Sequence, residues 1–263
     1  MRDKHHHRPP RRAFEASAER PTLLFGIHAV EAALGNPKRA IRALHLTDNA
    51  EHRLKEVLAA RQLAHIRVQP KDLDRRLGAD TVHQGALLET ELLSEPTLAE
   101  LADGAAGRPL IVLDQVTDPH NAGAILRSAA VFGCAGVIMT RRNSPPLDGA
   151  LAKSASGALE HVPVALVQNL ARAIAELKEL DFIVLGLDGE APGLLEATPW
   201  PDRSALVLGA EGKGLRQLTR ESCDQLCRIA TDGAIASLNV SNAAAVALHV
   251  AAMRRLGLMG PAS

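Results

Sequence analysis

Short, almost wholly apolar runs recur in the second half of this chain and alternate with Ala-rich amphipathic segments. The runs cover residues 110–113, 136–140, 183–187, 205–208 and 226–229. Each run is followed by a turn or helix signal, and strands that lack polar alternation are typically buried on both faces of a sheet. The pattern therefore predicts an α/β fold with a buried parallel sheet, followed by a final helix at about 242–256.

Composition divides the chain into four parts. They are a disordered basic arm (1–20), a small α/β domain (22–95), a linker (96–108) and a larger α/β domain (109–263). In the small domain we predict helices at 26–34 and 51–62 and strands at 42–47, 66–68 and 84–88. The arm holds six basic residues against three acidic ones. Such an arm is equally consistent with a polyanion contact and with a solvated tail.

The bulk composition excludes several classes of protein. No apolar run approaches the length of a membrane helix, and the N-terminus lacks a signal-peptide core, so we expect a cytoplasmic protein. Cys134, Cys223 and Cys227 form neither an even disulfide framework nor a zinc pattern, which predicts reduced thiols and no metal site. Aromatic residues make up 2% of the chain, which disfavours a stacking platform for single-stranded nucleic acid.

The first polar cluster follows the opening strand of the larger domain and holds Asn121, Gly123 and Arg127. Gly123 and Arg127 share a helix face, whereas Asn121 and Arg127 are six residues apart and lie far apart around the helix. An Arg among Ala, Ile and Leu requires a partner if it is buried. A salt bridge to a neighbouring carboxylate is the simpler explanation of Arg127 taken alone.

The second cluster is the Gly-rich segment 209–215 behind the strand that ends at Leu208, and it contains Glu211. Glycines at the carboxyl end of a parallel strand let a ligand approach the backbone. The spacing G-x-x-G-x-G is not the dinucleotide fingerprint, and a plain strand-to-helix turn is the alternative explanation.

The third cluster runs from Ile229 to the start of the last helix and includes Ser237, Asn239 and Ser241. Asn239 or Ser241 could cap that helix. Three such side chains around one helix start exceed what a cap requires, which favours a binding role.

In their order and spacing, the three clusters resemble the motifs of the TrmH-like branch of the SPOUT superfamily of RNA 2′-O-ribose methyltransferases. They are similar to N-x-G-x-x-x-R, L-G-x-E-G-x-G and S-L-N-V-S, respectively. Residues 25–30 and 82–85 also resemble the substrate-binding domain of that group, so the resemblance covers residues 22–255. Within the family, it is nearest to bacterial enzymes that methylate a guanosine ribose in 23S ribosomal RNA.

This resemblance implies a ribosomal-protein-like RNA-binding front domain and a SPOUT domain with a deep trefoil knot. It implies S-adenosyl-L-methionine as the cofactor, held largely by backbone at Leu208, Gly209, Gly214, Ile229 and Leu238. It also implies a homodimer that acts on RNA and on neither DNA nor membranes. The family usually has Pro-Met after the Ile, whereas this chain has Ala230-Thr231, so we expect a less rigid loop here.

The resemblance also assigns catalytic residues. Arg127 would contact the ribose hydroxyl and the adjacent phosphate, and Asn121 would orient Arg127 or the ribose. Glu211, Asn239 and Ser241 would complete the pocket. Since the pKa of Arg exceeds about 12, stabilisation of a developing alkoxide is a more plausible role for Arg127 than proton removal.

Three other functions are compatible with parts of the pattern. A transfer-RNA ribose methyltransferase would share the fold, and so would a nonenzymatic RNA-binding factor in ribosome assembly. A nicotinamide dehydrogenase fits the α/β alternation but lacks the fingerprint and its distal acidic residue.

Overall fold

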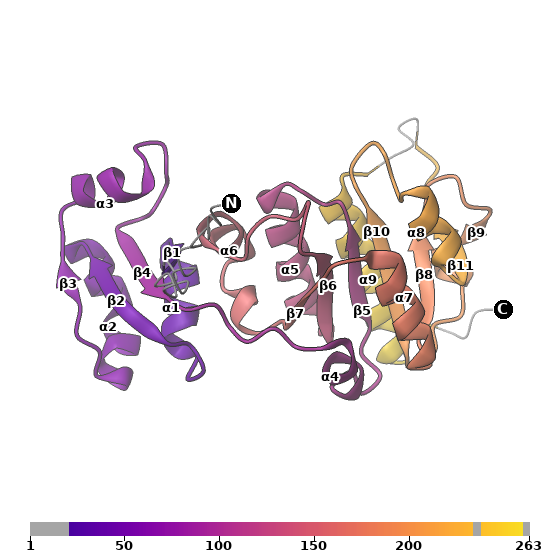
Figure 1. The fold of residues 1–263 in the computed structure, drawn as a ribbon, viewed down its shortest axis with the longest axis horizontal. Helices are drawn as coiled ribbons and strands as arrows, with labels where there is room; N and C mark the ends of the chain where they lie inside the picture. Colours follow the sequence, from indigo (N-terminus) through magenta and orange to yellow (C-terminus); the bar gives the residue numbers. More distant parts are fainter. Residues whose placement is uncertain (1–20, 234–237, 260–263) are drawn as a thin grey trace, which may run out of the picture.

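The computed structural model describes residues 21–233 and 238–259, which form two α/β units joined side by side (Figure 1). The predicted basic arm, residues 1–20, and Ser237 lie outside the described residues. Both units therefore have the fold class expected from the sequence.

The front unit is a four-stranded sheet with the order β1-β4-β2-β3. Its elements are β1 (Thr22–Phe25), α1 (Ile27–Gly35), β2 (Ile41–Leu46), α2 (Asp48–Arg61), β3 (Ile66–Arg67), α3 (Pro70–Leu77) and β4 (Ala86–Thr90). Strands β1 and β2 pair antiparallel with β4, and β3 is parallel to β2. The helices and strands predicted in this unit are present, but β1 and α3 were missed because each is too short to show a clear period.

Residues 84 and 85 were predicted to start a strand, but they form a turn before β4. Gln84 has φ +54° and Gly85 has φ +80°. The side-chain Oε1 of Gln84 accepts a hydrogen bond from the N–H of Ile27 at 3.0 Å, which holds the first turn of α1. A Cβ on Gly85 would lie 2.2 Å from Oγ1 of Thr47. The segment that resembles a substrate-binding motif therefore fixes the local backbone.

The second unit contains a seven-stranded sheet with the order β7-β6-β5-β10-β8-β11-β9, in which every pairing is parallel. Its strands are β5 (Leu110–Asp114), β6 (Gly136–Thr140), β7 (Val164–Val167), β8 (Ile183–Leu187), β9 (Gly193–Leu194), β10 (Ser204–Gly209) and β11 (Gln225–Arg228). The five predicted strands and the predicted parallel sheet are confirmed. Strand β9 was missed because it has only two residues, and β7, an apolar run of four residues, was overlooked.

Helices cover both faces of this sheet. They are α4 (Leu98–Asp103), α5 (Pro119–Phe132), α6 (Gly149–Ala155), α7 (Leu170–Glu179), α8 (Gln217–Ser222) and α9 (Val240–Arg255), with 3-10 turns η1 (Ala158–Glu160) and η2 (Leu195–Ala197). Alternate side chains of a strand serve the two faces. Ile111 and Leu113 belong to the core cluster that includes α5 and α9, whereas Leu110 and Val112 belong to the cluster that includes α4 and α7.

Two features bear on the sequence expectations for this unit. Helix α4 lies inside the segment 96–108, expected as a linker, and its Leu98 and Leu101 are buried. This segment therefore contributes to the core of the second unit.

The trefoil knot implied by the resemblance stays a prediction, because residues 234–237 on the path to α9 lie outside the described residues.

The two units share one continuous hydrophobic cluster. Helix α6 of the second unit packs against β1 and α1 of the front unit. A Cβ on Gly149 of α6 would lie 2.1 Å from Cε1 of Phe25, so only glycine permits this approach. The orientation of the front unit is therefore fixed by packing as well as by the connecting chain.

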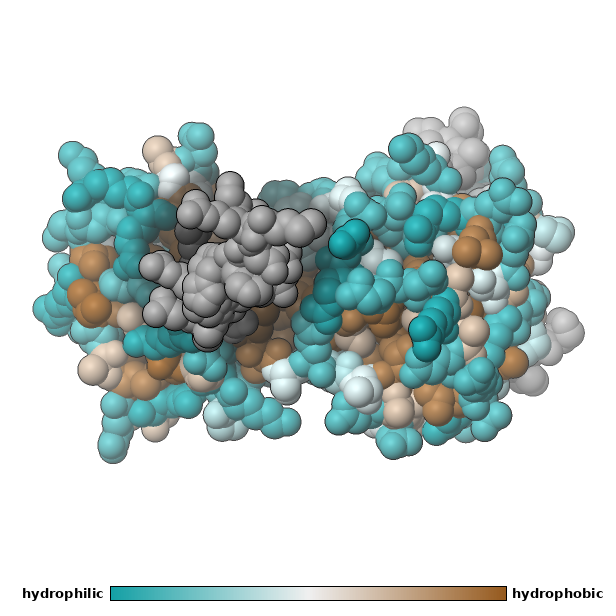
Figure 2. Space-filling view, in the orientation of Figure 1, coloured by the Kyte–Doolittle hydropathy of each residue, from teal (hydrophilic) through white to brown (hydrophobic). Residues whose placement is uncertain are grey.

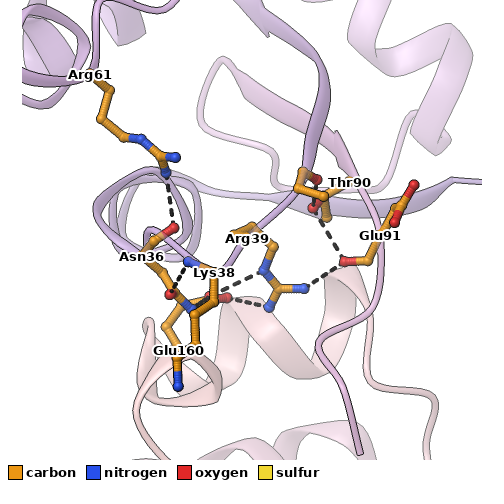
Figure 3. A network of polar contacts seen from close by, with 8 residues as sticks. Asn36, Lys38, Arg39, Arg61, Thr90, Glu91 and Glu160 are labelled. Atoms are coloured by element: carbon orange, nitrogen blue, oxygen red, sulfur yellow. Dashed lines mark hydrogen bonds and ion pairs between the residues drawn. The ribbon is translucent and has the colours of Figure 1, made fainter.

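A buried ion pair crosses the same interface (Figure 3). Arg39 of the front unit donates to both carboxylate oxygens of Glu160, at 3.1 and 2.5 Å, and to the main-chain oxygen of Glu91 at 2.8 Å. Asn36 also donates to Glu160, at 2.8 Å. The side chains of Arg39 and Glu160 are 1% and 2% exposed. Every charge in this pair is therefore compensated, as a buried pair requires.

The face of the molecule shown in Figure 2 is mainly hydrophilic over both units, with separate hydrophobic patches. Among the described residues, no helix has the length and apolar character needed to cross a membrane. The described part of the chain also holds no group of three or more His, Cys, Asp or Glu side chains suited to a metal ion.

Candidate functional site

The three polar clusters meet at one edge of the large sheet. Strands β5 and β10 are parallel neighbours whose last residues, Asp114 and Gly209, are register partners. The chain leaves β5 toward β6 on one side, whereas β10 pairs with β8 on the other. Crevices for ligands in open α/β sheets form at the carboxyl ends of strands where the order changes in this way.

The Gly-rich segment after β10 folds back on its own strand. The N–H of Gly214 donates to the main-chain oxygen of Ala210 at 2.9 Å. A Cβ on Gly209 would lie 2.1 Å from the carbonyl carbon of Gly214 and 2.4 Å from the nitrogen of Leu215. Only glycine fits at position 209, so the loop presents main-chain groups at the strand end.

Asp114 fixes the far end of that loop. Its side chain is fully buried, and it accepts hydrogen bonds from the N–H of Arg216 at 3.0 Å and from its Nε at 2.7 Å. The sequence interpretation did not single out Asp114. The available signal was one carboxylate at the end of an otherwise apolar strand.

Helix α5 places the first cluster beside this loop. Asp118 caps the helix by accepting from the N–H of His120 at 2.9 Å, and Pro119 occupies its first turn. A Cβ on Gly123 would lie 2.5 Å from Cβ of Ser154 and 2.8 Å from the main-chain oxygen of Leu151. Gly123 therefore permits the close packing of α5 on α6.

Four of the predicted catalytic residues form one hydrogen-bonded network. Nδ2 of Asn239 donates to Oδ1 of Asn121 at 3.0 Å and to Oε2 of Glu211 at 2.9 Å. Nδ2 of Asn121 donates to the same Glu211 oxygen at 3.4 Å. The N–H and Oγ of Ser241 both donate to Oδ1 of Asn239, at 2.9 and 2.6 Å. Three segments far apart in sequence thus meet at one carboxylate.

Asn239 has two structural roles at once. It is the N-cap of α9, because its Oδ1 accepts a hydrogen bond from the N–H of Ser241. A helix cap was one of the roles predicted for Asn239 from the sequence. Its amide nitrogen simultaneously contacts the other two clusters. A cap alone would leave that nitrogen to solvent, so the additional contacts agree with a role in a site.

Arg127 lies outside the network. Its side chain is exposed, and within the described residues it forms no hydrogen bond or ion pair. The salt bridge considered as its simpler explanation is therefore absent from the described part of the chain. Val131, one helical turn further along α5, is 72% exposed, so both side chains lie on the open face of the helix.

The five predicted cofactor-binding residues differ in exposure. Leu208 is buried in β10, Gly209 and Ile229 are half-buried, and Gly214 and Leu238 are exposed. Leu208 and Gly209 lie at the end of β10, whereas Ile229 directly follows β11. Main-chain groups at the ends of two strands and an exposed apolar side chain, Leu238, fit a ligand with both polar and apolar parts.

The cysteines do not contribute reactive groups. Burial raises the pKa of Cys134 and Cys227 to about 12 and that of Cys223 to about 11. All three are free thiols, as the sequence predicted, and their protonated form is inert as a nucleophile or metal ligand near neutral pH.

Comparison with known proteins covers both units. Residues 108–249 match the SpoU rRNA Methylase family, and residues 23–96 match the family model described as RNA 2′-O ribose methyltransferase substrate binding. The 23S rRNA (guanosine-2′-O-)-methyltransferase RlmB of Ralstonia nicotianae is 42% identical, over 89% of this chain and 96% of that protein. The enzyme of the same name from Vibrio vulnificus is 39% identical, over 89% and 97%.

A solved structure has the same fold. The SpoU methyltransferase AviRb from Streptomyces viridochromogenes, in complex with the cofactor AdoMet, superposes with a TM-score of 0.75 and 22% identity, over 89% of this chain and 90% of that one. The match of the family model to more than half of the chain and the identity to the curated relatives lead to one conclusion. This chain belongs to the SpoU rRNA methylase family.

Proposed function

We propose that this protein transfers a methyl group from S-adenosyl-L-methionine to the ribose 2′-hydroxyl of a guanosine in 23S ribosomal RNA. The observation that carries the proposal is the meeting of Asn121, Glu211 and Asn239 beside the backbone-lined end of β10. The relatives that share both units are named for this activity.

The cofactor would be held mainly by main-chain groups at Gly209, Gly214 and Ile229, with Leu238 covering an apolar part. Gly209 supports this assignment, because the loop closes on it too tightly for any side chain. When bound, S-adenosyl-L-methionine supplies an electrophilic methyl group and requires no metal. Ala230-Thr231 replace the family's usual Pro-Met. The main-chain N–H of Ala230 donates to the carboxylate of Glu196 and is therefore not free for the cofactor.

The protein's own contribution is alignment and electrostatic stabilisation. Holding two reacting groups in line can supply roughly 7–11 kcal/mol of barrier reduction. Arg127, which has no protein partner among the described residues, would contact the ribose hydroxyl and the adjacent phosphate. Its guanidinium would stabilise the oxyanion that develops as the hydroxyl passes its proton to solvent water. Asn121, Glu211, Asn239 and Ser241 would form the polar wall that orients the ribose.

The front unit, residues 22–95, would bind the RNA, with the second unit, residues 109–263, performing the transfer. The match of residues 23–96 to a substrate-binding family supports this division. The basic arm would add phosphate contacts, so RNA affinity should fall steeply as salt concentration rises. The protein would act in the cytoplasm, where ribosomal RNA is assembled.

The active form would be a homodimer. Helices α5 and α9 pack together and leave apolar side chains open to solvent. Val131 is 72%, Val246 38% and Leu256 62% exposed. Burial of these exposed apolar side chains against a second copy of the chain would favour self-association. Sedimentation equilibrium tests this arrangement: Val246→Asp should shift the protein toward monomer, and an active wild-type monomer would contradict it.

Mapping of ribose methylation in a deletion strain tests the activity. Ribosomal RNA should lack one 2′-O-methylguanosine, and the wild-type gene should restore it. Loss of a methyl group from transfer RNA instead would identify a transfer-RNA enzyme. If no methyl group is lost and calorimetry detects no binding of S-adenosyl-L-methionine, the protein is a nonenzymatic RNA-binding factor.

A further inference from the structure

The loop that follows β11 is held at its start by a side chain from another part of the chain. Both carboxylate oxygens of Glu196, in η2, lie 3.2 Å from the main-chain nitrogen of Ala230. Ala230 directly follows Ile229, which we have placed in the cofactor site. A carboxylate that accepts from a backbone N–H forms a stronger hydrogen bond than a neutral acceptor does.

The same residue also contacts the helix on the other side of the loop. Nη2 of Arg254, in α9, donates to the main-chain oxygen of Glu196. Arg254 is half-buried, and α9 packs on η2. Glu196 thus contacts both sides of the loop. Its carboxylate accepts from Ala230, where the loop begins, and its main-chain carbonyl accepts from Arg254 of α9, the helix that follows the loop.

The identity of residue 230 determines whether this contact can form. Proline has no backbone N–H and a fixed φ, so a proline here could not donate to Glu196 but would be rigid by itself. Alanine is freer and keeps its N–H. The hydrogen bond from Ala230 to Glu196 therefore restrains the position where the chain departs from the Pro-Met pattern.

We propose that Glu196 is a positioning residue that holds the start of the cofactor loop through the N–H of Ala230. Its consequence for S-adenosyl-L-methionine rests on the proposed function. Glu196 acts through the backbone, so it sets how well the loop is preformed for the ligand. Losing the acceptor should weaken cofactor binding, because part of the binding free energy is then needed to order Ile229 and Ala230.

A double-mutant cycle measured by calorimetry with S-adenosyl-L-methionine tests the proposal. Glu196→Ala should raise the dissociation constant about tenfold in the native background, as expected for loss of one charged hydrogen bond. In the Ala230→Pro background the N–H is already gone, so the same substitution should change the constant less than about twofold. Equal weakening in both backgrounds would overturn the proposal. Glu190→Ala, which removes an exposed carboxylate six residues earlier in the sequence, is the matched control.

Hydrogen exchange on the ligand-free protein provides a test that does not depend on the proposed function. Glu196→Ala should accelerate exchange of the Ala230 amide at least about tenfold and leave the amides of β10 unchanged. Unchanged exchange at Ala230 would overturn the inference even if Ala230→Pro fails to fold. If the wild-type protein shows protection at Ala230 but binds no S-adenosyl-L-methionine, the proposed function fails while the restraint by Glu196 stands.

Discussion

The interface between the two units and the candidate site both join segments distant in sequence through polar side chains, but they treat charge in opposite ways. At the interface, Arg39 and Glu160 are almost wholly buried. Both form hydrogen bonds to each other, and each forms a further hydrogen bond within the protein. At the site, Asn121, Glu211 and Asn239 remain partly open, and Arg127, six residues further along α5 than Asn121, has no partner in the described part of the chain.

This difference separates structural from functional use of polar groups. A buried charge must be compensated within the protein, and the Arg39 side chain, at 1% exposure, is out of reach of a ligand. The free-energy cost of leaving an exposed Arg unpaired is small, so its N–H donors remain available to a phosphate or a ribose. The interface therefore fixes where the front unit lies, and the site keeps its hydrogen-bonding capacity for RNA and cofactor.

The largest expected effect comes from breaking the interface pair. Glu160→Ala leaves the Arg39 guanidinium buried without its carboxylate and should lower the free energy of unfolding by about 3–5 kcal/mol, measured in urea. The double variant Arg39→Met/Glu160→Leu should recover most of that loss. Glu95→Ala, which removes an exposed pair with Arg141, should cost at most about 1 kcal/mol. Equal losses of unfolding free energy from Glu160→Ala and Glu95→Ala would show that burial does not distinguish the two ion pairs.

Removing the guanidinium at the site should leave stability intact and affect the reaction. Arg127→Ala should lower the methylation rate about a hundred- to a thousandfold, as expected for loss of a group that stabilises developing charge. Single-turnover assays with ribosomal RNA measure the rate, and calorimetry should show unchanged affinity for S-adenosyl-L-methionine. Arg172→Ala, an exposed Arg of α7 on the opposite face of the sheet, is the control. Retained methylation by Arg127→Ala would refute the assignment.

Asn239 allows the two roles of one side chain to be separated. Asn239→Ala removes both the cap and the network, and should lower unfolding free energy by about 1 kcal/mol and also slow methylation. Asn239→Ser retains a good, uncharged cap but lacks the amide donors to Asn121 and Glu211, so it should lose activity while keeping most stability. Asn169→Ala, which removes the plain N-cap of α7, should cost stability alone. Full activity of Asn239→Ser would show that the network is only structural.

The smallest effect is expected at the thiols, which neither region uses. The raised pKa values of about 12 keep Cys134 and Cys227 protonated at pH 8, so alkylation of the native protein should be slow and should accelerate as pH rises. Cys223, with a pKa of about 11, should react first. Mass spectrometry after iodoacetamide treatment measures the order. Rapid labelling of Cys227 at pH 8 would show that β11 opens.

The local sequence was sufficient for most of the sheet and for the helix that bears Arg127. Apolar runs and helix signals predicted β5, β6, β8, β10 and β11, because a strand that is buried on both faces consists almost entirely of apolar residues. Two-residue β9 and the short helix α4 are too brief for a pattern to be visible, whereas the apolar run of β7 was present in the sequence and was overlooked. Predicted strand 84–88 began two residues early, because the positive φ of Gln84 and Gly85 reflects contacts made elsewhere.

The sequence by itself determined the class of fold, the three polar clusters and, through their resemblance to a family, the chemistry to expect. Only the tertiary structure decided that Asn121 and Asn239, 118 residues apart, share a hydrogen bond, and that Arg127 stands apart from them. It also decided that Asp114 holds Arg216 and that Glu196 holds Ala230. The physical reason is that periodicity records which side of its own element a residue faces. Which elements meet depends on strand order and helix packing across the whole chain.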